Sequence, residues 1–178
     1  MTEIKPEIVR VDEVQAIKDI QITSFDGRHI DGIADLIVPI QRQEFGIPIT
    51  YDEQPDLRDI AGYYQRGAGN FWLAMADSRV VGTIALLDIG DGDGALRKMF
   101  VAADHRGKGR TVAARLLATL IGHARRFGLR TIYLGTTDKF LAAHRFYEKN
   151  DFALVDPSEL PDSFPKMKVD SRFYRLSL

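Results

Sequence analysis

Apolar and polar positions along this chain follow two periods, one typical of strands and one typical of helices. Seven short stretches have the alternation or the β-branched content of strands. They cover residues 19–25, 70–76, 79–89, 95–102, 130–136, 152–155 and 168–178. Four longer stretches have the apolar spacing or the terminal residues of helices, over residues 29–45, 55–67, about 109–127 and 138–150. The pattern therefore predicts seven strands and four helices.

Individual residues predict where these elements end. Pro39 should kink or shorten the first helix, because proline has no backbone N–H to donate. Gly128 should end the third helix, and Asp138 should cap the fourth. Residues 46–55 are expected to form a loop, and residues 1–18 an N-terminal extension.

The order of the elements predicts how the strands pair. The three consecutive strands between residues 70 and 102 should form antiparallel hairpins, because short turns join them. The strand–helix–strand run from 95 to 136 requires one parallel crossover. We therefore expect an α+β fold with mixed α/β order. It has a central, mostly antiparallel twisted sheet, a parallel pair at 95–102 and 130–136, and about four flanking helices. Residues 1–178 are expected to form a single domain.

The composition fits a globular protein and excludes some kinds of chemistry. Of the 178 residues, 45% are hydrophobic and 28% are charged, which is enough apolar content for a core. No cysteine is present, so disulfides, thiolate metal sites and cysteine nucleophiles are excluded. The first residues lack the apolar core of a signal peptide, and no apolar run approaches about 18 residues. We expect a cytoplasmic protein without a membrane partner.

Positive charge is concentrated in the second part of the chain. Residues 1–103 carry 17 acids and 10 bases, a net charge of −7, whereas residues 104–178 carry 8 acids and 14 bases, a net charge of +6. Between His105 and Thr137 there are seven Lys or Arg residues and no acid. A solvated surface is one explanation, and a local anion-binding site is the other.

The sequence DHRGKGRT, residues 104–111, favours the anion site. Arg106, Lys108 and Arg110 alternate with two glycines between a predicted strand and a predicted helix. Backbone N–H groups at a helix start attract anions, and glycine lets an anion come close. Thr111 could cap this helix, but a bound anion would satisfy the same donors. The spacing differs from the P-loop motif G-x-x-x-x-G-K-[ST] and from the dinucleotide motif G-x-G-x-x-G.

Metal and nucleic-acid sites fit the sequence less well. Residues 88–94, DIGDGDG, have no Glu at the twelfth position of a calcium loop and suit a hairpin turn. The four histidines are scattered, with no pair at metal-ligand spacing on one helix, so no metal is expected. The cations between residues 105 and 130 lack interleaved aromatic residues, which argues against a nucleic-acid partner.

Two motifs resemble those of the GNAT superfamily of acyl-CoA-dependent N-acyltransferases. In the first, [QR]-x-x-G-x-[GA], Arg106 and Gly109 match, and Thr111 replaces the small final residue. In the second, A-x-x-[FL]-Y-E-K-x-G-F, Asp151 stands in place of the usual Gly. The matching residues of this second motif are Ala143, Phe146, Tyr147, Glu148, Lys149 and Phe152. Together the motifs cover about residues 95–152, and the element order extends the resemblance over roughly 19–178.

The resemblance implies a fold, a co-substrate and a set of site residues. Acetyl-CoA or another acyl-CoA would bind where the strands 95–102 and 130–136 splay apart. Its pyrophosphate would lie on the backbone N–H groups of Arg106, Gly107, Lys108, Gly109, Arg110 and Thr111. Met99, Phe100 and Val101 would offer backbone partners to the pantetheine arm, and Tyr147 would protonate the departing CoA thiolate. The implied reaction is direct attack of an amine on the thioester in a ternary complex.

Several questions stay open in the sequence. The candidates for a general base are Glu44, Asp88, Asp91, Asp93 and His105, and a water relay or a neutral amine would need none. Gln41, Glu44, Phe45 and Tyr51 are candidates for the acceptor side, whereas Trp72 should lie in the core. The acceptor is a small-molecule amine or a protein amine. A non-catalytic acyl-CoA-binding sensor or interaction protein is the alternative function, and a homodimer paired through residues 168–178 is a further expectation.

Overall fold

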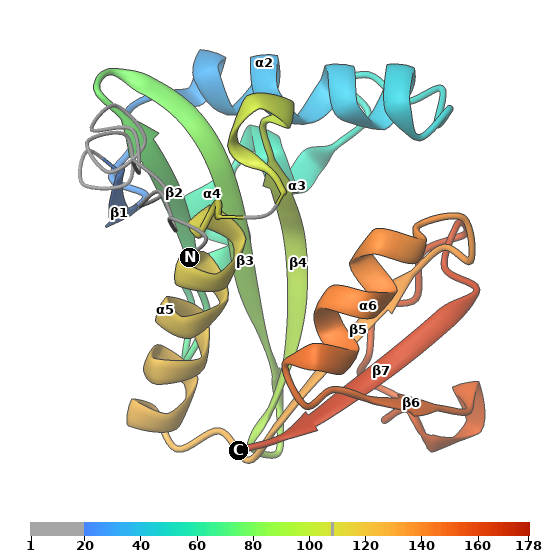
Figure 1. The fold of residues 1–178 in the computed structure, drawn as a ribbon. Helices are drawn as coiled ribbons and strands as arrows, with labels where there is room; N and C mark the ends of the chain where they lie inside the picture. The colour runs from blue at the N-terminus through green and yellow to red at the C-terminus, as the bar shows by residue number, and fades with distance from the viewer. Residues whose placement is uncertain (1–19, 108) are drawn as a thin grey trace, which may run out of the picture.

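The computed structural model describes residues 20–107 and 109–178, which share one seven-stranded sheet (Figure 1). The strands are β1 (Ile20–Ser24), β2 (Asn70–Ala76), β3 (Arg79–Gly90), β4 (Asp93–Val101), β5 (Thr131–Thr136), β6 (Ala153–Val155) and β7 (Arg172–Ser177). Their order in the sheet is β1-β2-β3-β4-β5-β7-β6. All neighbours are antiparallel except β4 and β5, which are parallel. This confirms the predicted mixed sheet and its one parallel pair.

Five α-helices flank the sheet, where about four were expected. They are α2 (Ile30–Pro39), α3 (Pro55–Arg58), α4 (Ile60–Tyr64), α5 (Val112–Arg126) and α6 (Leu141–Lys149). The extra helix arises because Asp59 interrupts the stretch predicted as one helix over 55–67. Asp59 has non-helical dihedral angles, and its carboxylate accepts a hydrogen bond from the N–H of Gly62 at 2.9 Å. It therefore caps α4 and separates it from α3.

The predicted start of the third helix, about residue 109, is three residues too early. Gly107 and Gly109 have φ angles of 98° and 79°, so the chain is in a left-handed conformation there and the helix begins at Val112. The predicted cap at Asp138 is also wrong. Phe140 precedes the first residue of α6 and makes no side-chain cap hydrogen bond, because a turn from Thr137 to Phe140 comes first.

Pro39 changes the helix type rather than ending the helix. The chain continues after α2 as a π-helical turn, η1 (Ile40–Glu44), which is wider than an α-helical turn. Short 3₁₀ turns occur at η2 (Ala103–His105) and η3 (Pro157–Glu159). The turn η1 brings Gln41 and Phe45 over the central strands, where the site described below is formed.

The strand predicted over residues 168–178 lies inside the sheet, which leaves little of it free to pair with a second subunit. The strand there is β7, which begins at Arg172 and lies between β5 and β6, so both of its edges have partners within the chain. The predicted N-terminal extension, residues 1–18, lies outside the described residues. Among the described helices, none has the length and apolar content needed to cross a membrane.

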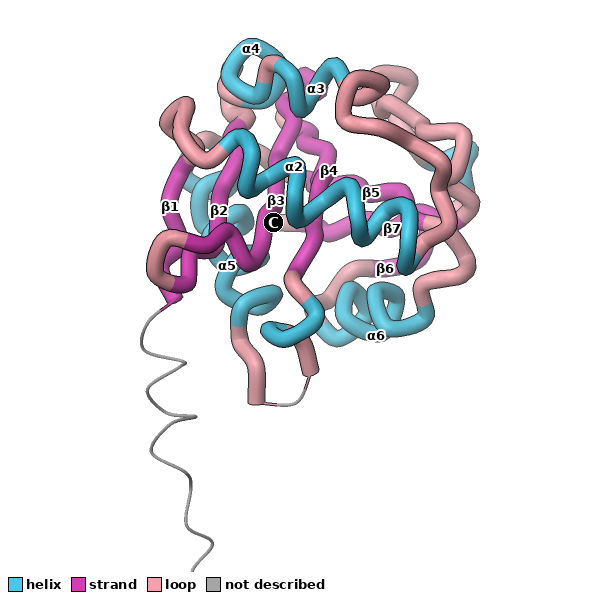
Figure 2. Tube along the Cα trace, turned by 90° about the horizontal axis from the view of Figure 1, so that it is seen from above, coloured by secondary structure: helices cyan, strands magenta, loops and turns pink. Residues whose placement is uncertain are grey.

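The core lies between the sheet and the helices on its two faces. Helix α2 crosses one face of the central strands, and α5 runs along the other (Figures 1 and 2). Leu116, Leu117 and Leu120 of α5 are buried against β3, and Trp72 is buried in β2, as its predicted core position requires. A smaller apolar cluster lies under β6 and β7 and includes Tyr133, Phe164 and Phe173. The rigid central strands thereby support the site on β4.

Replacing Leu116 by alanine should lower the free energy of unfolding by about 2–5 kcal/mol, since it removes a fully buried side chain and leaves a cavity. Urea unfolding followed by circular dichroism measures this loss. The matched control is Leu154→Ala, because Leu154 on β6 is 55% exposed and its removal should change the free energy by less than about 1 kcal/mol. Equal losses in the two variants would contradict the core placement of α5.

Candidate active site

The parallel strands β4 and β5 separate soon after they meet. Their pairing covers only Asp93–Ala95 and Thr131–Tyr133, and beyond these residues the strands diverge (Figure 1). A bulge in β4 lies next to the split: the register with β3 shifts between Thr83 and Ala85, and Lys98 has a φ angle of 50°. The hydroxyl of Thr83 donates to the carbonyl oxygen of Lys98 at 2.7 Å and holds the bulge. The backbone of β4 beyond the split thus faces an open gap.

A cavity of about 700 Å³ occupies one side of this gap. Its walls come from β4, the loop after it, the first turn of α5 and helix α6. Of the residues predicted to bind the co-substrate or to act on it, seven line this cavity. They are Met99, Phe100, Val101, Arg106, Gly107, Arg110 and Tyr147. Gly109 and Thr111 belong to the adjoining loop but not to the lining, and Lys108 lies outside the described residues.

The start of α5 offers backbone donors to this cavity. Thr111 precedes the helix, but its side chain makes no cap hydrogen bond, so of the two alternatives left open by the sequence, capping by Thr111 is not the one seen. The N–H groups of a first helical turn have no intrahelical partner, and the helix dipole adds partial positive charge there. The side chains of Ala113 and Ala114, which line the cavity, are too small to cover those groups. The arrangement suits a bound anion.

Arg106 joins the end of β4 to the turn η1. Its guanidinium forms a two-pronged ion pair with Glu44, with N–O distances of 2.6 and 3.0 Å. Its Nε also donates to the carbonyl oxygen of Val101 at 2.5 Å. Glu44, a candidate base in the sequence, is therefore engaged in an ion pair, and the carbonyl of Val101 already accepts a hydrogen bond.

Tyr147 lies on α6, and its phenol is buried next to β4. Its hydroxyl lies 3.7 Å from the sulfur of Met99 on β4, and its ring packs against those of Phe146, Phe152 and Tyr174. Burial raises the pKa of Tyr147 well above that of a free tyrosine. The phenol therefore keeps its proton throughout the ordinary working range of pH.

Histidine 144 fixes the start of the helix that carries Tyr147. Its Nε2 lies 2.8 Å from the carbonyl oxygen of Thr137, and Nη1 of Arg172 lies 2.9 Å from its Nδ1. An arginine can only donate, so Nδ1 accepts and Nε2 carries the ring proton. This neutral, buried histidine ties α6 to the end of β5 and to β7.

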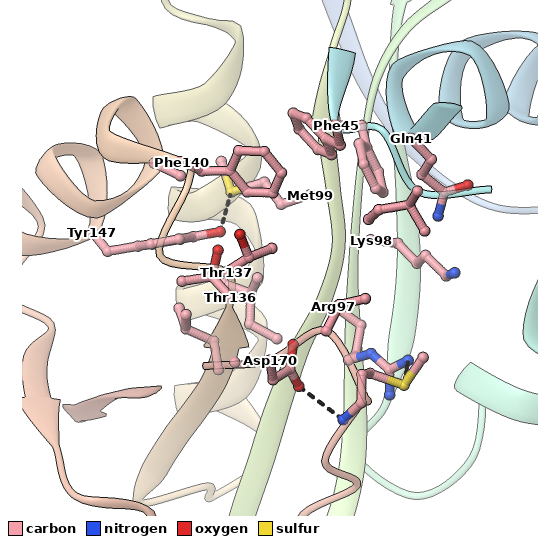
Figure 3. A pocket seen from close by; sticks show the side chains of 18 residues that line it. Gln41, Phe45, Arg97, Lys98, Met99, Thr136, Thr137, Phe140, Tyr147 and Asp170 are labelled. Atoms are coloured by element: carbon pink, nitrogen blue, oxygen red, sulfur yellow. Dashed lines mark hydrogen bonds between the residues drawn. The ribbon is translucent and has the colours of Figure 1, made fainter. Parts of the chain in front are cut away.

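A second cavity of about 190 Å³ lies beside the first (Figure 3). The two cavities share lining residues, which are Phe45, Met99, Phe100, Phe140, Ala143 and Tyr147. Of the predicted acceptor-side residues, Gln41 and Phe45 line the small cavity, whereas Glu44 and Tyr51 do not. The small cavity reaches Tyr147 along the end of β5 and residues 167–170 and has no lining residue from the glycine loop.

A buried polar network forms one wall of the small cavity. The side-chain amides of Gln41 and Gln54 exchange two hydrogen bonds of 3.0 and 2.9 Å. Lys98 donates to Gln54 at 2.7 Å and lies 3.2 Å from a carboxylate oxygen of Asp56, which also accepts from Tyr64 at 2.6 Å. Burial lowers the pKa of Lys98, and Asp56 opposes that effect. The charge of Lys98 is thus balanced within the protein.

Arg97 and Asp170 bring the other two charges to the small cavity (Figure 3). Nη2 of Arg97 lies 3.3 Å from the sulfur of Met167, and Nη1 is shielded from solvent without a hydrogen-bond partner in the described part of the chain. Asp170 accepts the N–H of Met167 at 2.9 Å. Burial raises the pKa of the Asp170 carboxyl, while that hydrogen bond and the nearby Arg97 act in the opposite direction.

Sequence reasoning missed both Arg97 and Asp170 as site residues. Asp170 is the single carboxylate that lines either cavity among residues 20–107 and 109–178. A β-carbon at Gly135 would lie 2.5 Å from an oxygen of Asp170, so the lack of a side chain at Gly135 lets Asp170 lie against β5. No motif or spacing in the residues around Asp170 predicts this contact.

Of the other candidate bases, the three aspartates lie away from both cavities and His105 does not. Asp88, Asp91 and Asp93 are near the β3–β4 turn and line neither cavity. Asp88 accepts hydrogen bonds from the N–H groups of Ala68 and Gly90. His105 does line the large cavity, with Nδ1 2.9 Å from a carboxylate oxygen of Asp104.

Comparison with known proteins shows which family this chain resembles. The model of the acetyltransferase (GNAT) family matches residues 34–152, which is more than half of the chain. N-acetylaspartate synthetase from Danio rerio is 36% identical over 106 residues, which cover 58% of this chain and 37% of that protein. The chain thus spans less than two fifths of the length of that relative.

Two solved structures match over nearly their whole length. An acetyltransferase of the GNAT family from Staphylococcus aureus Mu50 is 37% identical, with a TM-score of 0.83 over 89% of this chain and 98% of that one. An acetyltransferase from Streptococcus agalactiae is 32% identical, with a TM-score of 0.86 over 90% and 99% of the two chains.

Proposed function

Because this chain belongs to the GNAT family of acetyltransferases, we propose that it transfers an acetyl group from acetyl-CoA to an amine. The observation that carries the proposal is the junction of the two cavities at Tyr147 and Met99. One cavity leads there from the glycine loop and the other from the end of β5 and residues 167–170, so two substrates can meet at one phenol. The sequence resemblance and the family match point to the same reaction.

The residues around the large cavity fit coenzyme A. Arg110 and Lys139 supply positive charge, whereas the charge of Arg106 is paired with Glu44, and the first turn of α5 supplies backbone donors for a pyrophosphate. Phe100, Phe140 and Phe146 give an apolar wall for a pantetheine arm, and the diverged edge of β4 offers it backbone partners. When bound, acetyl-CoA supplies the activated acetyl group.

The chain's own groups would assist the transfer in two places. A backbone N–H near the β4 bulge would stabilise negative charge on the thioester oxygen, and a fixed donor costs no reorganisation. Tyr147 would hold a proton beside the sulfur. The amine nitrogen bonds to the carbonyl carbon as the C–S bond breaks with its electron pair on sulfur. Tyr147 protonates that sulfur and regains a proton from the nitrogen, so the products are an amide and a free thiol.

The names of relatives suggest which acceptors to try first. The relative from Danio rerio is an N-acetylaspartate synthetase, so aspartate heads the list for this chain. A small-molecule amine and a protein amine are both candidate acceptors. The non-catalytic acyl-CoA-binding protein is the second candidate, since the site contains no carboxylate in direct contact with Tyr147 among the described residues.

Acetyl-CoA at about 100 times its dissociation constant should stabilise the chain by about 2.7 kcal/mol. For a chain of this size the melting temperature should rise by about 5–10 °C. Thermal unfolding with acetyl-CoA, CoA, ATP and NAD at equal concentration measures this effect, and ATP and NAD should give smaller shifts. The absence of a shift with both acetyl-CoA and CoA would contradict the proposal. A shift without thiol release from any amine would favour the non-catalytic alternative.

The homodimer and the cytoplasmic location stay predictions. Support for association comes from β6, which is an edge of the sheet and carries the half-exposed Leu154. Support for a single domain comes from the shared sheet that holds all the described strands.

A further inference from the structure

Arg97 is the charged residue of the small cavity whose hydrogen-bonding capacity is least used. A guanidinium has five N–H donors, all directed in one plane. The contact described for Arg97 is a 3.3 Å approach to the sulfur of Met167, which is a weak acceptor. Its Nη1 is shielded from solvent and has no partner within the described residues. A buried donor without an acceptor is costly, so such a group calls for a ligand.

The neighbouring lysine makes the contrast clear. Lys98 follows Arg97 in β4 and lines the same cavity, but its ammonium is satisfied by Gln54 and by the carboxylate of Asp56. No ion pair within 4.0 Å joins Arg97 to any acid in the part of the chain that the structure describes. The protein therefore balances one of these two adjacent cations and leaves the other facing the cavity.

We propose that the acceptor is a small amine that carries a carboxylate, and that Arg97 binds this carboxylate in the small cavity. The proposal rests on the acetyl transfer proposed above. The planar guanidinium matches a carboxylate through two parallel hydrogen bonds, which fixes both position and orientation. Binding would give the guanidinium a carboxylate partner, which no acid among the described residues provides within 4.0 Å.

The position of Arg97 suits an amino acid with its nitrogen directed toward Tyr147. In Figure 3, Arg97 and Asp170 lie toward one end of the cavity, Tyr147 and Met99 toward the other, and Thr136 and Thr137 between them. A carboxylate held by Arg97 would leave the amino group of the same molecule free to reach the junction with the large cavity. The volume of about 190 Å³ fits a small molecule.

Asp170 is consistent with a zwitterionic acceptor. Its carboxylate lines the same cavity and is held by the N–H of Met167, so a carboxylate ligand alone would meet some repulsion from it. An amino acid presents an ammonium as well as a carboxylate. The opposite charges of Arg97 and Asp170 therefore match the two charges of an amino acid as it binds, and the amino group attacks only after it has lost its proton and moved to the junction at Tyr147.

The test compares an amino acid with its carboxamide in the wild-type protein and in variants at position 97. Aspartate, glutamate and the other standard amino acids are the probes, each with its α-amide, and thiol release from acetyl-CoA is measured. At least one amino acid should be acetylated, with kcat/KM about tenfold or more above that of its amide. Arg97→Met should raise the KM for that amino acid about 10- to 100-fold and remove the preference. Arg97→Lys keeps the charge but loses the planar guanidinium, so its KM for the amino acid should lie between those of the wild type and Arg97→Met.

Two controls separate this proposal from structural damage and from failure of the proposed function. Arg125→Met removes an exposed arginine in the last turn of α5. It should change neither the KM for the amino acid nor the KM for its amide. The melting-temperature shift with acetyl-CoA should be the same in Arg97→Met as in the wild type, because Arg97 does not line the large cavity. If acetyl-CoA does not raise the melting temperature of the wild type, the proposed acetyl transfer itself is overturned, and the assignment of Arg97 with it.

Three results would overturn the assignment of Arg97 while acetyl-CoA still binds. One is equal turnover of amino acids and their amides. Another is a preference for carboxylates that survives in Arg97→Met. The third has two parts. The wild type acetylates amines that lack a carboxylate, and it acetylates no amino acid at millimolar concentration faster than Arg97→Met does.

Discussion

Replacing Tyr147 by phenylalanine should lower kcat by about 10²- to 10⁴-fold, the range usually lost with a general acid. The phenol is buried at the junction of the two cavities, and its hydroxyl lies 3.7 Å from the sulfur of Met99. Phenylalanine keeps the ring that packs against Phe146 and Phe152, so the fold should be retained. Steady-state kinetics with a fixed acceptor, together with the acetyl-CoA melting shift, separate catalysis from binding.

The matched control for this variant is Tyr174→Phe. Tyr174 lies in the same aromatic cluster, with its ring 6.1 Å from that of Tyr147, but it lines neither cavity. Its hydroxyl bonds to Glu148, so its loss should cost some stability and leave kcat within about threefold. A Tyr147→Phe enzyme with full kcat at every pH would contradict the acid assignment.

The pH dependence of the wild-type rate follows from the direction of the Tyr147 shift. Burial raises the pKa of this phenol, so the protonated form that an acid needs persists as the pH rises. We therefore expect no loss of kcat from ionisation of Tyr147 between about pH 6 and 10. A decline that begins near pH 8 and disappears in Tyr147→Phe would contradict the burial of the hydroxyl.

Replacing Ala114 by aspartate should weaken acetyl-CoA binding by about 100-fold or more while leaving the apo protein as stable or slightly more stable. Ala114 is an exposed residue in the first turn of α5 and lines the large cavity. A carboxylate there interacts favourably with the helix dipole, which is worth about 0.3–1 kcal/mol. The same carboxylate would occupy the donors and repel the pyrophosphate. Calorimetric titration with acetyl-CoA and thermal unfolding without it measure the two effects.

The control for Ala114→Asp lies one turn further along the same helix. Ala118 is also exposed, but it lines neither cavity. Ala118→Asp should cost a few tenths of a kcal/mol in stability, through lower helix propensity, and should leave acetyl-CoA binding within about twofold. If both variants bind acetyl-CoA as the wild type does, the anion does not lie at the start of α5.

Local patterns in the sequence determined the elements and the family. Alternation and turn residues predicted all seven strands and their mostly antiparallel order, because each hairpin depends on residues close together in the chain. The motif residues Arg106 and Tyr147 line the large cavity and could be singled out from the sequence, since the loop and the helix that present them are continuous segments. Errors fell at boundaries such as Gly109 and Asp138, where one dihedral angle or one turn moves a helix end.

Tertiary structure alone decided which charged residues line the small cavity. Simple alternation along β4 does not predict the bulge at Lys98, which follows from the register with β3 and the hydrogen bond from Thr83. The bulge lets Lys98 pair with Asp56, which lies about 40 positions away in the sequence. Arg97 and Asp170 meet at one cavity only because β4 and β5 diverge. Such contacts depend on the register and separation of strands, which no short stretch of sequence encodes.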